Sequence, residues 1–491
     1  MINTDVKPQS VFETLWTDGI DKRTSKVAIS PHALTRCRNA QYRDGILEKA
    51  AGIEIVYDAE KAVESTFEWN GKHIYSNGQN LYYTDYTTET LIGVLSGTSH
   101  PYYVLYDADL LVASGNNIQY IDTSWAITTV ATSPNLDRLW IRGGRVCGSL
   151  AGDDFAYESK VGTFKAVGDW DTSPQPAEDW SSVAAVDYIN TPLYYEIGYK
   201  DGLDIVSVSI LSDDIIFFKE KDGKRKQYRM QGYFPDWTIT ELAPPIHVYS
   251  ALSAINNIFI IGKDGFNSFT NVIQYGDLAR DETGSKVNVD MIQRVTDDAA
   301  IWHIPIRKCI YVKIRSENVL WCFYYTQKCS DGTVGAWTQR YLSAEPWEVW
   351  QFENETYIAF GNKIGRMDDD VTTDDSAEFT MDCGSKLFVG DDDFDVTQFK
   401  LYLENVVKGA GTIQVGGYLG SITFGDTDPI AYSDTSVAYT NTTVAYGKQY
   451  SDHKERIRAL LSGDVELALK VTSGKVRFVS LKVWTGVVAS G

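Results

Sequence analysis

A hairpin-like pattern recurs along the chain and constrains its fold more than any other feature. Each copy has a polar turn, about four apolar residues, a second turn with Gly or Asn, and another apolar group. Asn-Gly and Asp-Gly pairs, which supply the positive φ of tight hairpin turns, stand at Asn77-Gly78, Asp222-Gly223 and Asp264-Gly265. The copies cover residues 70–84, 107–122, 143–158, 212–229, 256–270 and 354–368, with a looser copy at 308–324.

The spacing of these copies indicates how they assemble. Successive copies begin roughly 35 to 70 residues apart, and the longest gap holds a further apolar stretch at 192–200. A period near 45 residues with one or two hairpins per unit is typical of propeller blades. Aromatic residues make up 13% of the chain, which also favours strands. We therefore predict an all-β fold with a β-propeller of about six or seven blades over 51–370. An array of β-sandwiches is the alternative.

Two different segments flank the repeats. Residues 1–50 carry scattered charge without a clear strand pattern, which predicts an N-terminal arm leading into the first blade. The acidic stretch 367–376 predicts a domain boundary. Beyond it, apolar and polar residues alternate at 399–403 and 476–479, as in half-buried strands. We predict a C-terminal, platform-like β-sandwich domain over 371–491.

The charge balance bears on possible partners. Lys and Arg total 45 against 66 Asp and Glu, a formal net charge of -21. A groove that grips DNA or an anionic membrane needs concentrated positive charge, so such binding is disfavoured, although a local basic patch remains possible. No secretory signal or membrane-spanning apolar run is visible in the sequence.

The cysteines form no metal or redox motif. They are too scattered for C-x-x-C, so we expect reduced thiols and synthesis in a reducing cytoplasm. They are Cys37, Cys147, Cys309, Cys322, Cys329 and Cys383.

Signatures of catalysis are missing from the sequence. It contains no G-x-S-x-G, no G-x-x-x-x-G-K-[ST] and no H-E-x-x-H. The glycine-rich stretch 409–418 has the wrong spacing for a nucleotide loop, and we interpret it as a turn with a strand glycine. We therefore predict no enzyme activity, no catalytic, metal-binding or cofactor-binding residues, and no cofactor.

Acidic clusters are the main enzymatic alternative. Asp153-Asp154 and Asp213-Asp214 begin hairpins, where Asp caps turns, and Asp391–Asp393 with Asp395 could ligate calcium. Glycoside hydrolysis needs two carboxylates at a fixed separation, whereas adjacent strand residues point to opposite faces. We interpret the clusters as turn residues.

Three other sequence features can each be interpreted as functional or as structural. Trp337, Trp347 and Trp350 could stack on sugars or pack between sheets, and packing is favoured. The basic run 219–229 could contact phosphate, but it is centred on a turn and predicts a solvated hairpin tip. The Pro- and Asp-rich stretch 169–180 predicts an exposed loop, a candidate for a gate or a subunit contact.

The histidines are isolated and show no metal spacing: His32, His73, His100, His247, His303 and His453.

Residues 30–53 resemble the opening of the tail nozzle or hub proteins of short-tailed bacteriophages, also called packaged-DNA stabilisation proteins. In that family an Asn precedes a G-x-L-x-K/R-x-x-G run that leads into the first blade. The closing segment 456–484 resembles the end of the same proteins. The matching residues of the opening are Asn39, Gly45, Leu47, Lys49 and Gly52.

The resemblance implies a structural virion protein of a phage tail, made in the host cytoplasm. Six copies would form a homohexameric ring below the portal and adaptor proteins, in contact with tail fibres or spikes. The ring would retain the packaged double-stranded DNA and conduct it during ejection without specific binding. The negative charge fits this role, because acidic walls repel DNA phosphates. Two alternatives stay open: a carbohydrate-binding or carbohydrate-degrading propeller that binds a receptor, and a scaffold propeller that binds proteins.

Overall fold

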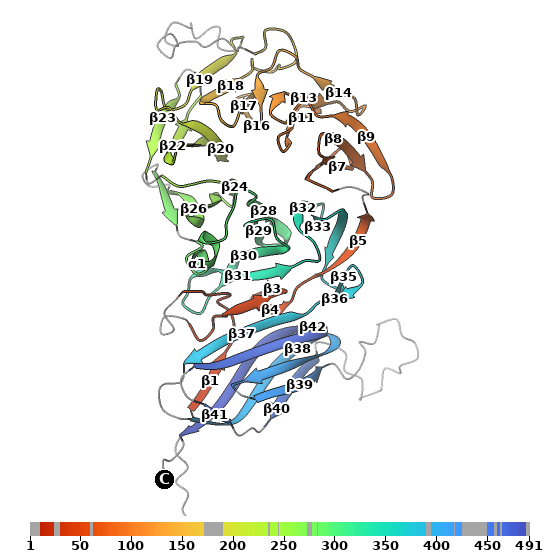
Figure 1. Cartoon of the computed structure of the whole chain (residues 1–491), viewed down its shortest axis with the longest axis vertical. Helices are drawn as coiled ribbons and strands as arrows, with labels where there is room; N and C mark the ends of the chain where they lie inside the picture. The colour runs from red at the N-terminus through yellow and green to blue at the C-terminus, as the bar shows by residue number, and fades with distance from the viewer. Residues whose placement is uncertain are drawn as a thin grey trace, which may run out of the picture.

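The computed structural model shows a β-propeller joined to a second all-β domain (Figure 1). The residues that it describes are 10–23, 30–58, 62–170, 190–233, 236–243, 245–272, 277–281, 283–388, 394–416, 418–424, 449–455, 459–461 and 464–487.

Four-stranded antiparallel units follow one another around the propeller axis. Within the described residues, six blades are sheets of their own, and the first four strands of the largest sheet fill the remaining place in the ring. This confirms the prediction of about six or seven blades. The first three units are β6–β9 (Ser65–Trp69, Lys72–Asn77, Asn80–Thr84, Glu89–Val94), β10, β11, β13 and β14 (Tyr102–Tyr106, Asp109–Ala113, Gln119–Ile121, Ile127–Thr129), and β16–β19 (Arg138–Arg142, Arg145–Ser149, Phe155–Glu158, Leu193–Glu196).

The remaining units complete the ring. A small ladder of β12 (Asn116–Asn117) with β15 (Asn135–Leu136) lies between the second and third units, and a short helix, α1 (Asn288–Ile292), follows β27. The other four units are β20–β23 (Asp204–Leu211, Asp214–Lys221, Lys224–Gln231, Thr238–Leu242), β24–β27 (Ser250–Ala254, Asn257–Gly262, Gly265–Val272, Asp277–Asp281), β28–β31 (Ala300–Ile304, Cys309–Lys313, Val319–Lys328, Val334–Tyr341), and β32–β34 with β5 (Pro346–Phe352, Glu355–Phe360, Lys363–Asp368, Gly52–Asp58).

The recurring apolar run of the sequence is the second strand of each unit. These strands are buried along almost their whole length, because neighbouring blades cover both faces of each sheet. The predicted turns are also present: Gly78, Gly223 and Gly265 all have positive φ. The strand that precedes each run mixes buried with partly exposed residues, so no continuous apolar pattern marks it in the sequence.

The ring closes with a strand from the opposite end of the sequence. β5, near the N-terminus, pairs antiparallel with β34, so the last unit combines three late strands with one early strand. Such closure ties the first and last blades together through backbone hydrogen bonds.

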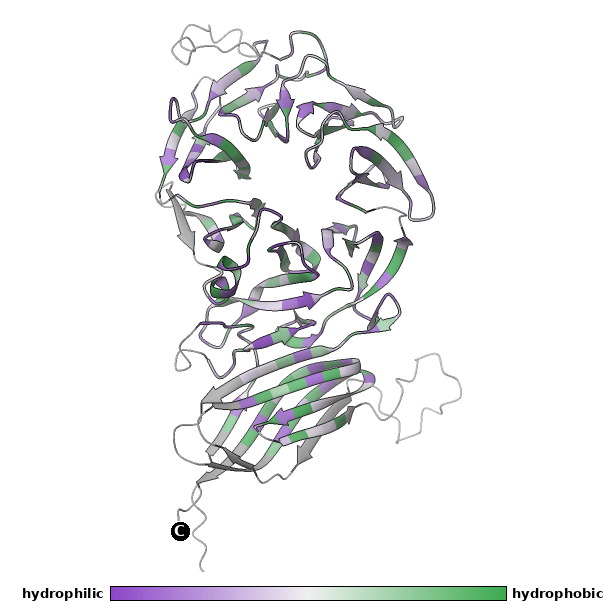
Figure 2. Cartoon of the chain, viewed as in Figure 1, coloured by the Kyte–Doolittle hydropathy of each residue, from purple (hydrophilic) through white to green (hydrophobic). Residues whose placement is uncertain are grey.

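The C-terminal domain is built on two long strands, β38 (Phe394–Val415) and β42 (Asp464–Val487). They pair along their length, and several register shifts bend them, so the domain predicted as a β-sandwich is one curled sheet. Hydrophobic and hydrophilic residues alternate along its strands (Figure 2). The other strands are β37 (Met381–Phe388), β39 (Tyr418–Phe424), β40 (Gln449–Glu455) and β41 (Ala459–Leu461).

Where the structure describes residues 1–50, predicted as an N-terminal arm, their strands pair with both domains. β1 (Ser10–Thr14) pairs with β42, while β2 (Arg36–Arg38) lies between β31 of the propeller and β37 of the C-terminal domain. β3 (Ala40–Arg43) and β4 (Ile46–Lys49) form a hairpin whose second strand also pairs with β42. One hydrophobic core consequently runs from the propeller into the C-terminal domain.

Candidate functional sites at the domain joint and on the propeller axis

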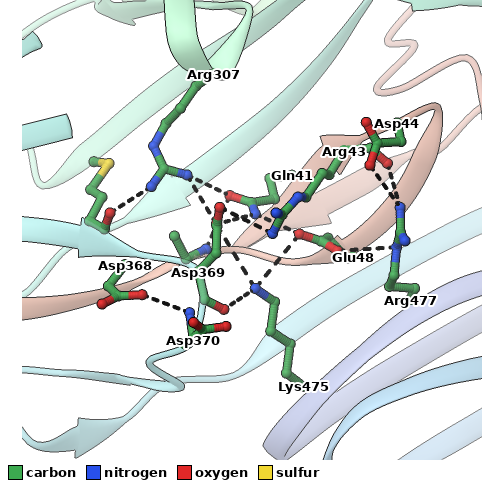
Figure 3. Close-up of polar contacts among 12 residues, drawn as sticks. Gln41, Arg43, Asp44, Glu48, Arg307, Asp368, Asp369, Asp370, Lys475 and Arg477 are labelled. Carbon is green, nitrogen blue, oxygen red and sulfur yellow. Dashed lines mark hydrogen bonds and ion pairs between the residues drawn. The ribbon is translucent and has the colours of Figure 1, made fainter. Parts of the chain in front are cut away.

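Side chains from four parts of the chain meet between the two domains (Figure 3). We call this region the joint. It comprises the β2–β4 segment, the strap 368–379, the 3₁₀ turn Pro305–Arg307 of the propeller, and the part of β42 around Lys475 and Arg477.

Asp369 of the strap is the centre of the polar contacts. Its carboxylate lies 3.2 Å from the guanidinium of Arg307 and 3.2 Å from that of Arg43, and Gln41 donates a 2.9 Å hydrogen bond to it. Burial alone would raise the pKa of Asp369, but Arg307, with Gln41 and Lys475, outweighs burial and lowers it. The ionised carboxylate of Asp369, in the strap, thus contacts both the propeller, through Arg307, and the β3–β4 hairpin, through Arg43 and Gln41.

Lys475 and Arg477 bring the C-terminal domain into the same network. The Lys475 ammonium lies 3.7 Å from the carboxylate of Glu48 and also donates to the backbone oxygen of Asp369. Arg477 lies 3.3 Å from the other oxygen of Glu48. Lys475 and Glu48 are almost completely buried, so each ionised group needs the opposite charge of the other to offset its lost hydration.

A second group of charges holds the far end of the strap. Arg340 of β31 pairs with Asp374 at 2.5 Å and donates to the backbone oxygen of Ala51. Arg340 and Lys49 both lie over the ring of Phe379, at 4.2 Å and 4.5 Å from its centre. Burial lowers the pKa of Lys49 to about 8. The strap is therefore fixed at both ends.

These contacts explain the N-terminal motif that carries the resemblance. Asn39 accepts a 2.8 Å hydrogen bond from the Tyr341 backbone and donates one to Thr380, and Leu47 is buried in the core. Gly45 has a φ of +82° in the β3–β4 turn. A side chain at Gly52 would lie 2.5 Å from the Thr373 backbone oxygen, so the strap excludes one. Four residues of the motif lie in the β2–β4 segment of the joint, and Gly52, at the start of β5, packs against the strap.

The acidic stretch expected as a boundary lies between the last propeller strand and β37. Its short strands β35 (Thr373–Asp374) and β36 (Ala377–Glu378) pair with each other, and β35 also pairs with β5. Its Asp369 and Asp374 carboxylates pair with Arg307 and Arg340, which are distant in sequence, so the stretch is held in place.

A cavity of ≈ 260 Å³ opens on the propeller axis, between the inner strands of four consecutive units. Its walls combine apolar side chains with hydroxyls and one guanidinium. Its lining residues are Tyr102 of β10; Arg138, Leu139 and Trp140 of β16; Val208, Ser209 and Ile210 of β20; and Ala251, Leu252 and Ser253 of β24.

Arg138 is the one charged residue among the described residues that line this cavity. Its guanidinium donates to the Asp137 backbone oxygen at 2.8 Å and lies 3.9 Å from the Asp137 carboxylate. Sequence reasoning did not find this site, because its residues come from four separate inner strands.

The predicted acidic pairs take ordinary structural roles. Asp214 pairs with Arg229 at 2.5 Å across the β21–β22 hairpin, and Asp153 accepts a hydrogen bond from Tyr157. Burial raises the pKa of Asp154. Residues 391–393 lie outside the described part of the chain, as does the side chain of Asp395. Within the described residues, no cluster of His, Cys, Asp or Glu could hold a metal ion.

The basic run 219–229 forms the predicted hairpin and is largely neutralised. Lys219 is buried and pairs with Asp201 at 2.8 Å, while Lys221 pairs with Asp204 and Lys226 with Glu241, each at 3.0 Å. Paired lysines offer little attraction to a phosphate, which agrees with the structural interpretation.

The three tryptophans do not form one surface. Trp337 is buried in the core against Phe323. Trp347 and Trp350 belong to a different cluster, where Trp350 stacks on His73 at 4.4 Å. Burial lowers the pKa of His73 to about 3, as expected for a core histidine.

The predicted exposed loop begins inside the protein. Asp169 and Trp170 are buried, and Trp170 donates a hydrogen bond to the Phe164 backbone. The rest of that stretch, from residue 171, lies outside the described residues. The described part of the chain has no helix long and apolar enough to span a membrane.

Comparison with known proteins identifies no family. No family model matches the chain, and no curated protein is similar to it. Among solved structures, PorZ, a surface component of the type-IX secretion system of Porphyromonas gingivalis, aligns with 77% of this chain at 15% identity and a TM-score of 0.39. The extracellular domain of BT4673 from B. thetaiotaomicron aligns with 86% at 9% identity and a TM-score of 0.43. The alignments span 46% and 59% of those chains.

Proposed function

We propose that this protein is a structural subunit of a short-tailed phage virion, a tail nozzle or hub protein without enzymatic activity. Six copies would form a ring below the portal and adaptor, retain packaged DNA and conduct it during ejection. The observation that carries the proposal is the joint, where the residues that resemble the family motif hold propeller, strap and C-terminal domain together. A part that withstands the pressure of a packaged genome needs domains that do not move apart.

The charge of the chain supports the same role. A net charge of -21 on every copy would surround a passing duplex with repulsive walls. A repulsive passage needs acidic walls, but the described residues that line the axial cavity include no acidic side chain and one charged residue, Arg138. In this proposal the passage for DNA therefore lies between copies and not along the propeller axis.

The test is the assembly state of the purified protein. Mass photometry and negative-stain imaging over a range of concentrations, with and without the adjoining adaptor protein, should reveal rings of six copies of the 54.9 kDa chain, roughly 330 kDa. Solitary particles under every condition, or hydrolysis of a glycan by those particles, would contradict the proposal.

A further inference from the structure

Two cysteines face each other across β2 and β37. Cys37 and Cys383 are Cα partners in this antiparallel pair, and their sulfur atoms lie 3.5 Å apart. Facing residues of antiparallel strands have Cα atoms about 4.5–5.5 Å apart, inside the range of about 4.4–6.8 Å that a disulfide spans. Both thiols are free, and their sulfurs must approach by about 1.5 Å to reach the S–S bond length of about 2.0 Å. The backbone therefore already has the spacing that a disulfide needs.

This arrangement distinguishes the facing pair from the other cysteines. In the strand pairs that the structure describes, no other two cysteines are Cα partners. Cys309 and Cys322 lie on the adjacent strands β29 and β30, but Cys309 faces Tyr324 and Cys322 faces Tyr311. Such diagonal neighbours lie roughly 7–8 Å apart, beyond the reach of an unstrained disulfide. The geometry thus selects one pair out of six thiols.

The places of the facing pair in the sequence give a cross-link a large effect. Cys37 precedes β5, the strand that closes the ring, and Cys383 follows β34, the last strand of the propeller. A bond between them would enclose every propeller unit in one covalent loop, from residue 37 to residue 383. A cross-link stabilises a protein mainly by restricting the unfolded chain, and the effect grows with the length of the loop.

From this geometry we propose that Cys37 and Cys383 form a disulfide when the protein meets a thiol oxidant, and that the bond locks the joint covalently. Two S–H bonds break and one S–S bond forms, while the oxidant takes up the two electrons and the two protons. Diamide does so at its N=N bond, and a small disulfide does so by becoming two thiols. In a reducing cytoplasm the pair stays open, and in an oxidising medium it closes. This inference does not depend on the proposed virion role.

Burial controls how fast the bond forms. Both side chains are fully buried, and burial raises the pKa of the Cys37 thiol, so little of the reactive thiolate is present. The oxidant reaches the pair when the joint opens, and the closed joint then shields the bond from reductants. The bond should therefore form faster in urea just below the unfolding transition than in buffer.

The experiment uses the full chain, purified with a reductant that is then removed. The protein is incubated with diamide, in buffer and in urea just below the unfolding transition, and is then alkylated and digested without reduction. Mass spectrometry should find the peptides of Cys37 and Cys383 joined, with the loss of two hydrogen atoms. After removal of the oxidant, the urea midpoint of the oxidised protein should exceed that of the reduced protein by at least about 0.5 M.

Two variants separate the facing pair from its neighbours. Cys383→Ala should abolish both the joined peptides and the rise in the urea midpoint. Cys322→Ala removes a buried thiol from the same core and leaves the facing pair in place, so it should keep both. Three results would overturn the proposal: no link between Cys37 and Cys383 in either medium, a link from Cys37 to Cys322 in its place, or a wild-type midpoint that oxidation leaves unchanged.

Discussion

Glu48 of β4 and Lys475 of β42 face each other in the joint, with Oε1 and Nζ 3.7 Å apart and side chains that are 2% and 1% exposed. One residue belongs to the N-terminal hairpin and the other to the last strand of the chain. The pair therefore ties the two ends of the sequence together at the point where the propeller meets the C-terminal domain (Figure 3).

Removing either member of this pair should destabilise the protein strongly. Lys475→Met leaves the buried Glu48 carboxylate with less compensating charge, and Glu48→Gln does the same to Lys475. Breaking a buried pair in this way typically costs about 3–5 kcal/mol. Urea unfolding followed by tryptophan fluorescence measures the effect.

A surface pair supplies the control. Lys482 and Glu13 lie 3.2 Å apart and are about one-third and two-fifths exposed. Lys482→Met should cost less than about 1 kcal/mol. Equal losses for Lys475→Met and Lys482→Met would contradict the view that the joint is held by buried charge.

Gly52 should not tolerate a side chain. A Cβ atom there would lie 2.5 Å from the Thr373 oxygen and 2.6 Å from the Val371 oxygen, both in the strap backbone. Gly52→Ala must therefore displace the strap, and we expect a loss of about 2 kcal/mol or more. Gly45→Ala is the matched variant, because that site has a φ of +82° but open space. It should cost only about 1 kcal/mol of backbone strain. Urea midpoints of the two variants separate crowding from strain.

The blades could be predicted from the sequence because their signals are local. The turn at Asp222-Gly223 and the apolar run before it lie within one hairpin, so a short window contains both partners. The same holds for the alternation at Phe399 and Leu401, which are buried with Lys400 between them half-buried. Local patterns thus predicted the fold class.

The joint and the cavity could not be predicted in this way. Cys37 of β2 lies opposite Cys383, and Leu47 of β4 lies opposite Phe478, each pair separated by more than three hundred residues. Strands of three to five residues carry too little pattern to reveal such partners. The sequence predicts the acidic stretch 367–376 only as a domain boundary, because the arginines that pair with Asp369 and Asp374 are distant in sequence. The N-terminal motif is the one predicted sequence feature in this region, and its residues alone do not identify the groups that they contact.

Stability should fall as the pH rises through the range in which Glu348 ionises. Burial raises the pKa of Glu348, on the inner strand β32, from 4.5 to about 8, against the opposing effects of Trp302 and Lys313. Between these values the folded protein holds a proton that the unfolded chain has lost, so each step up in pH favours unfolding.

Glu348→Gln should remove this dependence, and its advantage in stability over wild type should grow between about pH 5 and about pH 8. Urea midpoints measured across that range provide the test, with the exposed Glu353→Gln as the control. A constant difference between wild type and Glu348→Gln would contradict the assignment.

The native protein should protect its thiols from reagents in solution. All six cysteines are buried, and burial raises the pKa of the Cys37, Cys147 and Cys309 thiols, so few thiolates form. Ellman's reagent should therefore detect the full set only after unfolding in urea.

Cys329 should be the first thiol to react when the native protein is left with the reagent. It is the most exposed of the six at 7%, and its sulfur lies 3.4 Å from the ammonium of Lys286, whose charge favours the thiolate although burial keeps the pKa raised. Cys329→Ser should remove the earliest kinetic phase and leave the later ones unchanged. Cys37→Ser, by contrast, should leave the earliest phase intact, because the Cys37 sulfur is enclosed between β2 and β37, 3.5 Å from that of Cys383, and reacts only when the joint opens. A first phase that survives in Cys329→Ser would contradict this assignment, because another thiol would then react first.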